Sequence, residues 1–199
     1  MSNTGYALKS SMRQARASYF AANNFDDSGY NDDWVTFKLG PVPLTIPSTA
    51  GRKRAIAFHD LHHIVTGYPT DYAGEFEISA WEVGAGCGTN LAVWVINLSG
   101  LAGGSLFVPT RAFHAFCLGR RTHTLYRREI NDLLDQTVEE TRRDCGLIPQ
   151  PNVEPQLTDA ALYAAATLVG LVLGVTMAAA GLIASPIILG LSALRPRST

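Results

Sequence analysis

The chain has 199 residues, 47% of them hydrophobic, and its 16 basic and 17 acidic residues give a net charge of −1. Because this composition supplies no extended positive surface, it argues against a nucleic-acid partner. The three cysteines, Cys87, Cys117 and Cys145, are odd in number and form no C-x-x-C pair. They argue against a disulfide framework or a thiolate zinc site and favour reduced thiols in a cytoplasmic setting.

The first half of the chain predicts a helix, a β-hairpin and two further helices, over residues 10–23, 34–46, 49–66 and 73–85. Pro41, Pro43 and Pro47 cannot donate to a β-ladder, so the second strand of the hairpin is expected at an edge. Ser48 or Thr49 is placed to cap the second helix. The glycines that follow residue 83 end the third helix.

The second half predicts an apolar helix over residues 91–108 and an amphipathic helix over residues 124–145. The first is nearly long enough to span a membrane, but it is rich in small and polar residues and has arginines on both flanks. We interpret it as a buried or membrane-dipping helix. Gly146 is placed to stop the amphipathic helix, and a proline-rich segment follows it.

Residues 160–194 carry no charge, and residues 162–184 alone are long enough to cross a bilayer. Gly170 and Gly174 form a G-x-x-x-G pair, which predicts a homo-oligomer through closely packed helices. Ser185-Pro186 predicts a break and a short second helix at the interface. We interpret the tail as a membrane anchor, and a buried core helix is the alternative.

These patterns together predict a mainly α protein: a helical domain with a short N-terminal β-hairpin and a C-terminal membrane-associated helix. Residues 1–148 form the helical metal-binding domain in this interpretation. Residues 149–158 form a proline-rich linker, and residues 159–199 form the hydrophobic anchor.

Four side chains around the end of the second helix are candidate metal ligands. His59 and His63 are one helical turn apart and share a face, and Asp60 lies at the edge of that face. Gly67 and Pro69 break the helix, and Glu75 stands near the start of the next one. Two imidazoles and two carboxylates converging in this way predict a divalent-metal site, with Zn²⁺ or another divalent ion.

Two other interpretations of the His59-Asp60-Leu61-His62-His63 string fit less well. A histidine box of a di-iron desaturase needs more histidines than the five in this chain. A phosphohydrolase of the His-Asp type needs an earlier histidine ligand, and none precedes His59. His62 points away from the ligand face, which predicts a helix-surface or supporting role, and His114 and His123 are expected at the surface. Glu82 is either an ordinary helix charge or a support for the ligands.

The spacing H-D-x-x-H, eleven residues, then E resembles the signature of the coenzyme Q biosynthesis protein four family. The turn over residues 67–75 is similar to that family's glycine-proline-threonine turn, which enters a glycine-glutamate helix. Residues 127–146 resemble its charged carboxy-terminal helix. The similarity covers roughly residues 30–148, and the apolar tail lies outside it.

The resemblance implies a metal-dependent carboxy-lyase of ubiquinone biosynthesis. Such an enzyme decarboxylates, with or without oxidation, the C1 position of a polyprenylated 4-hydroxybenzoate-type head group at the membrane. His59, Asp60, His63 and Glu75 would be the metal ligands, and Asp60 or Glu75 could instead carry a proton. The alternative is a non-catalytic scaffold that binds lipid or quinone for a biosynthetic complex and holds a structural metal.

The partners implied are a polyprenylated aromatic lipid, the membrane and other quinone-biosynthesis enzymes. The location implied is the inner or cytoplasmic membrane, with the catalytic domain on the cytoplasmic or matrix side. The arginines on both flanks of residues 91–108 agree with that side, because basic loops stay in the cytoplasm.

Overall fold

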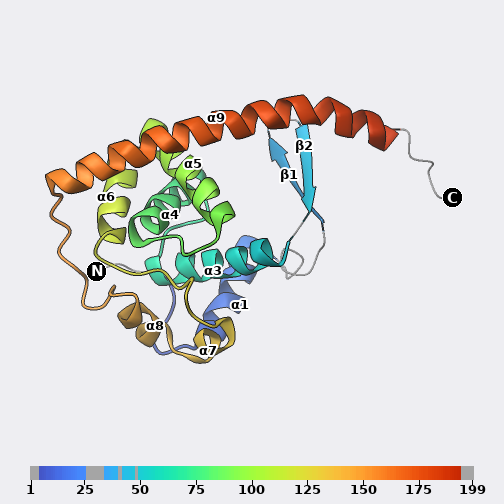
Figure 1. The fold of residues 1–199 in the computed structure, drawn as a ribbon. Coiled ribbons are helices and arrows are strands. Elements are labelled where there is room, and N and C mark those ends of the chain that lie inside the picture. The colour runs from blue at the N-terminus through green and yellow to red at the C-terminus, as the bar shows by residue number, and fades with distance from the viewer. Residues whose placement is uncertain (1–4, 26–33, 40–41, 48, 194–199) are drawn as a thin grey trace.

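The computed structural model describes residues 5–25, 34–39, 42–47 and 49–193, and the side chains of residues 5–25 and 49–180. As predicted, the protein is mainly helical. A bundle of shorter helices lies beneath one long C-terminal helix (Figure 1). The helices are α1 (Met12–Asn23), α3 (Ala50–Thr66), α4 (Tyr72–Ala85), α5 (Leu91–Phe107), α6 (Pro109–Gly119), α7 (Ile130–Asp135), α8 (Val138–Asp144) and α9 (Leu157–Ala193).

Two six-residue strands, β1 (Trp34–Leu39) and β2 (Val42–Pro47), occupy the region where the hairpin is predicted. They pair antiparallel, with Trp34 opposite Pro47 and Leu39 opposite Val42. Residues 40–41, where the turn is expected, lie outside the described residues. The hairpin therefore stays a prediction.

Helix α3 begins and ends where local chemistry dictates. The Thr49 side chain accepts a hydrogen bond from the backbone N–H of Arg52, which caps the first turn. Gly67 ends the helix in the left-handed conformation, with φ of 79°, and its N–H donates to the carbonyl of His63. The second half of α3 is buried, so the helix enters the core with its candidate ligands.

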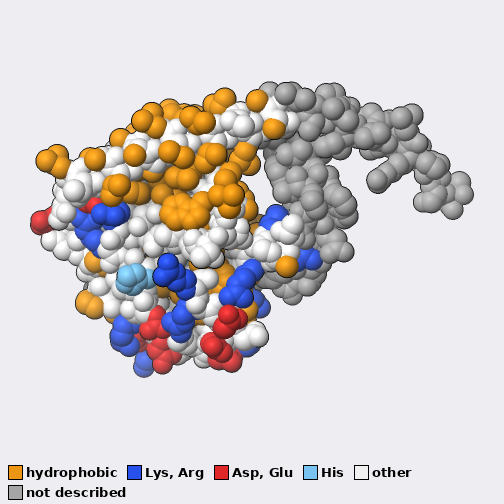
Figure 2. Space-filling model, viewed as in Figure 1, with side chains coloured by type: hydrophobic (Ala, Val, Ile, Leu, Met, Phe, Trp, Pro, Cys, Tyr) orange, Lys and Arg blue, Asp and Glu red, His pale blue; other side chains and the backbone are white. Residues whose placement is uncertain are grey.

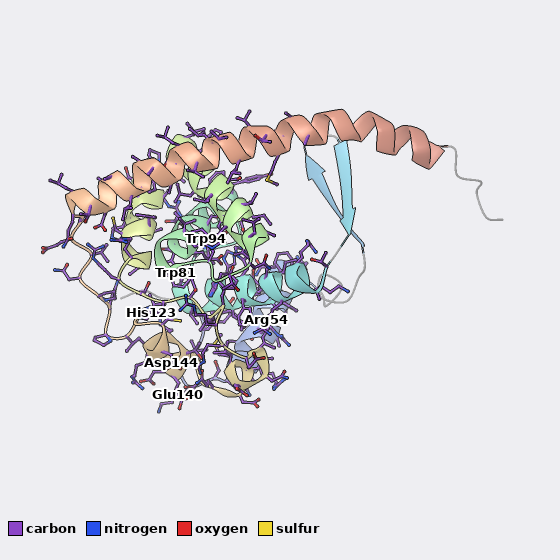
Figure 3. The ribbon with its side chains drawn as sticks, viewed as in Figure 1. Arg54, Trp81, Trp94, His123, Glu140 and Asp144 are labelled. Atoms are coloured by element: carbon purple, nitrogen blue, oxygen red, sulfur yellow. The ribbon has the colours of Figure 1, made fainter. Side chains whose placement is uncertain are left out.

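Helices α4 and α6 approach closely because a glycine stands on each side. A Cβ on Gly84 would lie 2.3 Å from the Phe116 carbonyl oxygen, and a Cβ on Gly119 would lie 2.2 Å from the Trp81 carbonyl oxygen. Trp81 is fully buried at this contact (Figure 3), and its indole N–H donates to the hydroxyl of Thr122 at 3.0 Å. Small residues therefore hold α4, the helix that carries Glu75, at a fixed position.

Helices α5 and α9 form an antiparallel pair. Ser105, near the end of α5, bonds the hydroxyls of Tyr163 and Thr167, near the start of α9, at 2.8 and 2.9 Å. Gly170, further along α9, lies against the carbonyl of Leu98, which precedes Ser105 in α5. The apolar tail thus packs lengthwise on the helical body.

The two glycines of the G-x-x-x-G pair face α5 of the same chain. A Cβ on Gly170 would lie 2.0 Å from the Leu98 carbonyl oxygen, whereas a Cβ on Gly174 would stand 3.7 Å from Ser99. The predicted homo-oligomer through these glycines stays a prediction, and it would have to displace α5 from the same face.

The amphipathic pattern over residues 124–145 is not one helix, and that prediction is wrong. The structure divides the segment into α7 and α8, with Gln136 and Thr137 between them. The Gln136 carbonyl accepts from the N–H of Met12, and Thr137 caps α8 in a capping box with Glu140. A tertiary contact with the start of α1 and a strong local cap together override the continuous helical pattern.

Two further predictions need correction. Helix α9 continues through Ser185-Pro186 to Ala193, so the predicted break is wrong. A proline inside a helix removes one backbone donor, and a long helix can continue past that loss with a bend. Helix α6 was not predicted, because the arginines within and after it were interpreted only as charges flanking the preceding apolar helix. Pro109 in its first turn is nevertheless a signal for the start of a helix.

We expect Gly170→Ala to destabilise the fold by about 2 kcal/mol, because the added methyl group must push α9 away from the α5 backbone. Gly174→Ala is the matched control on the same face. Its methyl group meets only ordinary contacts, and alanine gains about 1 kcal/mol of helix propensity over glycine. Denaturant unfolding of both variants in mild detergent measures the difference. Equal stabilities for the two variants would contradict the observed packing.

Candidate metal centre

The turn between α3 and α4 places the candidate ligands opposite one another. The Asp71 side chain accepts from the N–H of Gly74 at 2.8 Å and so caps α4. Gly74 lets the helix start close to the preceding turn, since a Cβ there would lie 2.0 Å from the Pro69 carbonyl oxygen. Glu75, the next residue, then faces His59 and His63 on α3.

Donor atoms of three side chains, His59, His63 and Glu75, face one another, and we call this cluster the triangle. The Nε2 atoms of His59 and His63 are 3.3 Å apart; Oε2 of Glu75 lies 3.2 Å from the first, and Oε1 of Glu75 lies 3.3 Å from the second. Ligands of a tetrahedral zinc ion with bonds of 2.0–2.1 Å stand about 3.3 Å from one another. The cluster of His59, His63 and Glu75 could therefore hold a metal ion.

The hydrogen bonds behind the two imidazoles leave the correct nitrogen free for a metal. His63 donates from Nδ1 to the carbonyl oxygen of Tyr68 at 2.9 Å, and a carbonyl can only accept. His59 donates from Nδ1 to the Glu82 carboxylate at 2.9 Å. Both rings therefore direct Nε2 into the triangle. Ligating histidines in metal proteins are held in the same way by a carboxylate or a carbonyl.

Glu82 is the centre of a buried hydrogen-bond network. Its side chain is fully buried and accepts from His59, from Nδ1 of His62 at 2.8 Å, from the amide of Asn97 and from the hydroxyl of Tyr126. These donors come from α3, from α5 and from the segment after α6. A buried carboxylate is tolerated when its lone pairs are satisfied in this way.

Charge in this network shifts the pKa of its members. Burial lowers the pKa of His59, but the carboxylates of Glu82 and Glu75 outweigh it and raise that pKa to about 10. Burial raises the pKa of Glu75, and the two histidines outweigh it and lower that pKa to about 2. The pKa of His62 is lowered by burial. Without a metal, His59 is therefore an imidazolium between two carboxylates.

We expect metal affinity to rise about tenfold per pH unit between about pH 6 and 9, because a metal must displace the His59 proton. Below its pKa of about 10, His59 stays protonated in the metal-free site, so the proton competes more strongly as the pH falls. Calorimetric titration with Zn²⁺ in buffers of different ionisation enthalpy would count the released proton. An affinity that is flat over this range would contradict the assignment of His59 as a ligand.

Asp60, the fourth predicted ligand, does not join the triangle. Its carboxylate is buried and accepts from the hydroxyl of Tyr19 at 3.3 Å, and the Tyr19 ring stacks on His63 with centroids 5.8 Å apart. Asp60 thus lies beside the cluster and links it to α1. Its role as a ligand or proton carrier stays a prediction.

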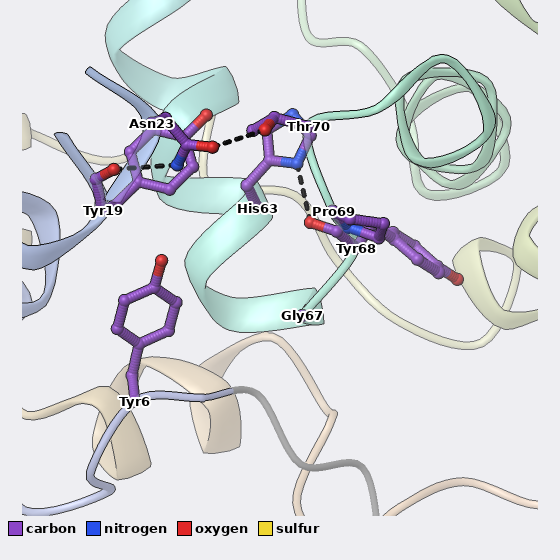
Figure 4. A pocket seen from close by; sticks show the side chains of 8 residues that line it. All are labelled: Tyr6, Tyr19, Asn23, His63, Gly67, Tyr68, Pro69 and Thr70. Atoms are coloured by element: carbon purple, nitrogen blue, oxygen red, sulfur yellow. Dashed lines mark hydrogen bonds between the residues drawn. The ribbon is translucent and has the colours of Figure 1, made fainter. Parts of the chain in front are cut away.

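The cluster lies at the protein surface on one side and beside a small cavity on the other. The side chains of His59 and Glu75 are 26% and 44% exposed, whereas His63 is 1% exposed. A cavity of about 220 Å³ lies against His63, between α1 and the turn after α3 (Figure 4). Tyr6, Tyr19 and Thr70 are among its lining residues. Small molecules can therefore reach the triangle from the side of Glu75.

The sequence identified the triangle but described the residues behind it incompletely. Glu82 stands two turns after Glu75, and its supporting role is the one that the structure shows. His62 is fully buried and accepts from the N–H of Leu125 at 2.9 Å, so a helix-surface role is wrong. Asn97 was missed, although a lone amide in an otherwise apolar helix was a usable signal. His114 and His123 are exposed, as predicted.

Comparison of the chain with protein-family models, with curated proteins and with solved structures found no match.

Proposed function

We propose that the protein is a metal-dependent carboxy-lyase of ubiquinone biosynthesis, as its resemblance to the coenzyme Q biosynthesis protein four family implies. Its substrate would be a polyprenylated 4-hydroxybenzoate-type lipid, and its reaction the removal of the C1 carboxylate as carbon dioxide. The observation that carries the proposal is the triangle of His59, His63 and Glu75. These are three of the four residues of the family-like motif, and their spacing fits a zinc ion.

Three converging side chains, rather than four, favour a catalytic metal site over a closed structural one. Catalytic zinc sites use three protein ligands and keep a further position for water or substrate. When bound there, a divalent ion would supply a Lewis acid that stabilises negative charge on a carboxylate or phenolate oxygen. His59, His63 and Glu75 would hold it, and Glu82 would orient His59 through Nδ1.

An exposed aromatic pair near the triangle supports a lipid substrate. Phe76, which follows Glu75, stacks on Phe107 with ring centroids 6.0 Å apart, and Phe107 is 74% exposed. An apolar tail could therefore lie on α5 while the head group reaches the triangle. Asp60 is a candidate to deliver the proton that replaces the carboxylate at C1. The oxidative form of the reaction would in addition need an oxidant.

The second candidate is a non-catalytic scaffold that binds quinone intermediates for partner enzymes and uses the metal as a structural clip. The specific observation in its favour is that the triangle joins the end of α3 to the start of α4 across one turn. Asp60, which accepts from Tyr19 in this structure, would then have to turn toward the triangle to complete a closed set of four donors.

The test supplies purified, metal-loaded protein with a short-prenyl 4-hydroxybenzoate, with and without dioxygen, and measures released carbon dioxide. We expect release that depends on the metal and falls at least about a hundredfold in Glu75→Gln, which keeps the side-chain size but removes the charge. Glu129→Gln is the matched control and should leave the rate unchanged, because this exposed carboxylate pairs with Arg54 and does not belong to the cluster.

No release with metal bound would overturn the catalytic proposal. If metal removal then lowers the melting temperature sharply, the structural clip accounts for the site. A stable metal-free protein that has lost its turnover would instead support the catalytic role.

A further inference from the structure

Apolar side chains gather along the side of the molecule that α9 forms (Figure 2). We use the name apolar strip for the exposed hydrophobic side chains of two helices. On α9 they are Leu162, Leu168, Val169, Val172, Val175 and Met177, and on α5 they are Leu91, Ile96, Leu106 and Phe107. Each is 45–75% exposed. Strips of this length on a soluble protein mark a contact surface.

The chemistry of α9 points to lipid as the partner of this strip. Within Leu157–Ala180 the most apolar 18-residue window has a mean hydropathy of 2.0, and only 6% of that window is buried. After Asp159 the described helix has no charged residue. Protein interfaces carry polar rims and hydrogen bonds, whereas a surface without them matches the acyl region of a bilayer.

The packing of α9 decides how it meets the bilayer. From Tyr163 to Gly174 one face of α9 packs against the helical body, which lies alongside this part of the helix (Figure 1). This packed length is about 17 Å at 1.5 Å per residue, more than half of a hydrocarbon core of about 30 Å. A perpendicular α9 would therefore draw the attached body into the membrane.

Charges stand at both ends of this packed length. Asp159, at the start of α9, pairs with Arg120 and Arg121 at 3.3 and 2.9 Å. At the other end of α5, Asn90 donates to the Gly51 carbonyl, in the basic first turn of α3. A spanning orientation would place these two ends at opposite leaflets and draw the body between them, including the Arg111–Glu77 ion pair of α6 and α4, toward hydrocarbon, where each charge costs several kcal/mol. An orientation along the surface keeps both ends at the head groups of one leaflet.

We infer that α9 lies in the plane of the membrane surface, with the apolar strip facing the acyl chains and the helical body on the aqueous side. The inference extends the proposed membrane location by giving the helix an orientation, and it does not depend on the metal or on the reaction. It also places Phe107, beside the Phe76 that follows Glu75, at the lipid boundary.

Depth measurement along one face of α9 tests the orientation. Ala161, Leu168 and Val175 are seven residues apart, so they point in nearly the same direction. We would replace each with cysteine in the full-length chain and attach a nitroxide. Collisional relaxation would then be measured on vesicles of phosphatidylcholine and phosphatidylglycerol. The native cysteines are buried and leave the labels selective.

We expect similar immersion depths at the three positions. A gradient of about 10 Å between successive labels, the rise of seven helical residues, would show a spanning helix and overturn the inference. That result would leave the proposed reaction intact, since carbon dioxide release is measured separately on the purified protein.

A double variant on the outer face tests the partner. Leu168→Asp with Val172→Asp should lower vesicle binding about a hundredfold or more, because it removes a leucine and a valine side chain that the bilayer would bury and adds two charges. Leu8→Asp, an exposed leucine next to α8, is the matched control and should bind as the unaltered chain does. Failure of the unaltered chain to bind vesicles would overturn the inference. So would a lipid-free dimer that the double variant converts to a monomer.

Discussion

His63→Ala is expected to weaken divalent-metal binding by about a hundredfold or more. The variant removes one of three converging donors, and structural zinc sites with four ligands bind with about 10–16 kcal/mol. The Nε2 atom of His63 lies 3.3 Å from both of its neighbours in the triangle, so no other side chain of the cluster replaces it. Metal analysis after dialysis, together with Zn²⁺ titration, measures the loss.

The side chain of His63 is almost fully buried, so the alanine variant also loses packing and leaves the Tyr68 carbonyl without its donor. His63→Asn separates the two effects. Its amide can still donate to Tyr68, but it carries no atom at the position of Nε2. We expect a melting temperature close to that of the unaltered protein and the same loss of metal. His123→Ala, an exposed histidine, should retain full affinity. Equal metal content in all three variants would refute the assignment.

Glu82→Ala is expected to destabilise the metal-free protein by about 3–5 kcal/mol, the usual cost of removing one partner of a buried ion pair. His59 and His62 each donate to this carboxylate, and Asn97 and Tyr126 donate to its other oxygen. All four donors would lose their carboxylate partner inside the protein. For a chain of this size we expect the melting temperature to fall by about 10 °C.

Glu82→Gln keeps the size of the side chain and removes its charge, so it tests positioning rather than folding. We expect metal affinity to fall about tenfold to a hundredfold, the usual effect of losing a carboxylate behind a ligating histidine. Glu77→Gln is the matched control on the same helix, because Glu77 pairs with the half-exposed Arg111 and does not contact the cluster. Unchanged affinity in Glu82→Gln would show that Glu82 is only structural.

Helix α3 and the turn into α4 could be predicted because the residues that start and end a helix lie within a few positions of its ends. A threonine cap, a left-handed glycine and the Gly67–Pro69 turn fixed α3 and the entry to α4. The same locality put His59 and His63 on one face and aligned Glu75 with them. The seven-residue spacing of Glu75 and Glu82 also carried usable information about support for the ligands.

Other features depended on contacts between distant segments. The split between α7 and α8 follows from the hydrogen bond between Met12 and Gln136. The continuity of α9 and the use of Gly170 against α5 follow from packing that no pattern in either segment specifies.

By itself, the sequence indicated the side chains of the candidate metal cluster and an apolar, helical tail, since helical periodicity and apolar character are properties of neighbouring residues. Only the tertiary structure decided that Asp60 turns toward Tyr19 and that His62 is buried. It also decided that Glu82 collects four donors from separate segments. The physical reason is that a buried carboxylate requires every available partner, and those partners are chosen by packing rather than by position in the chain.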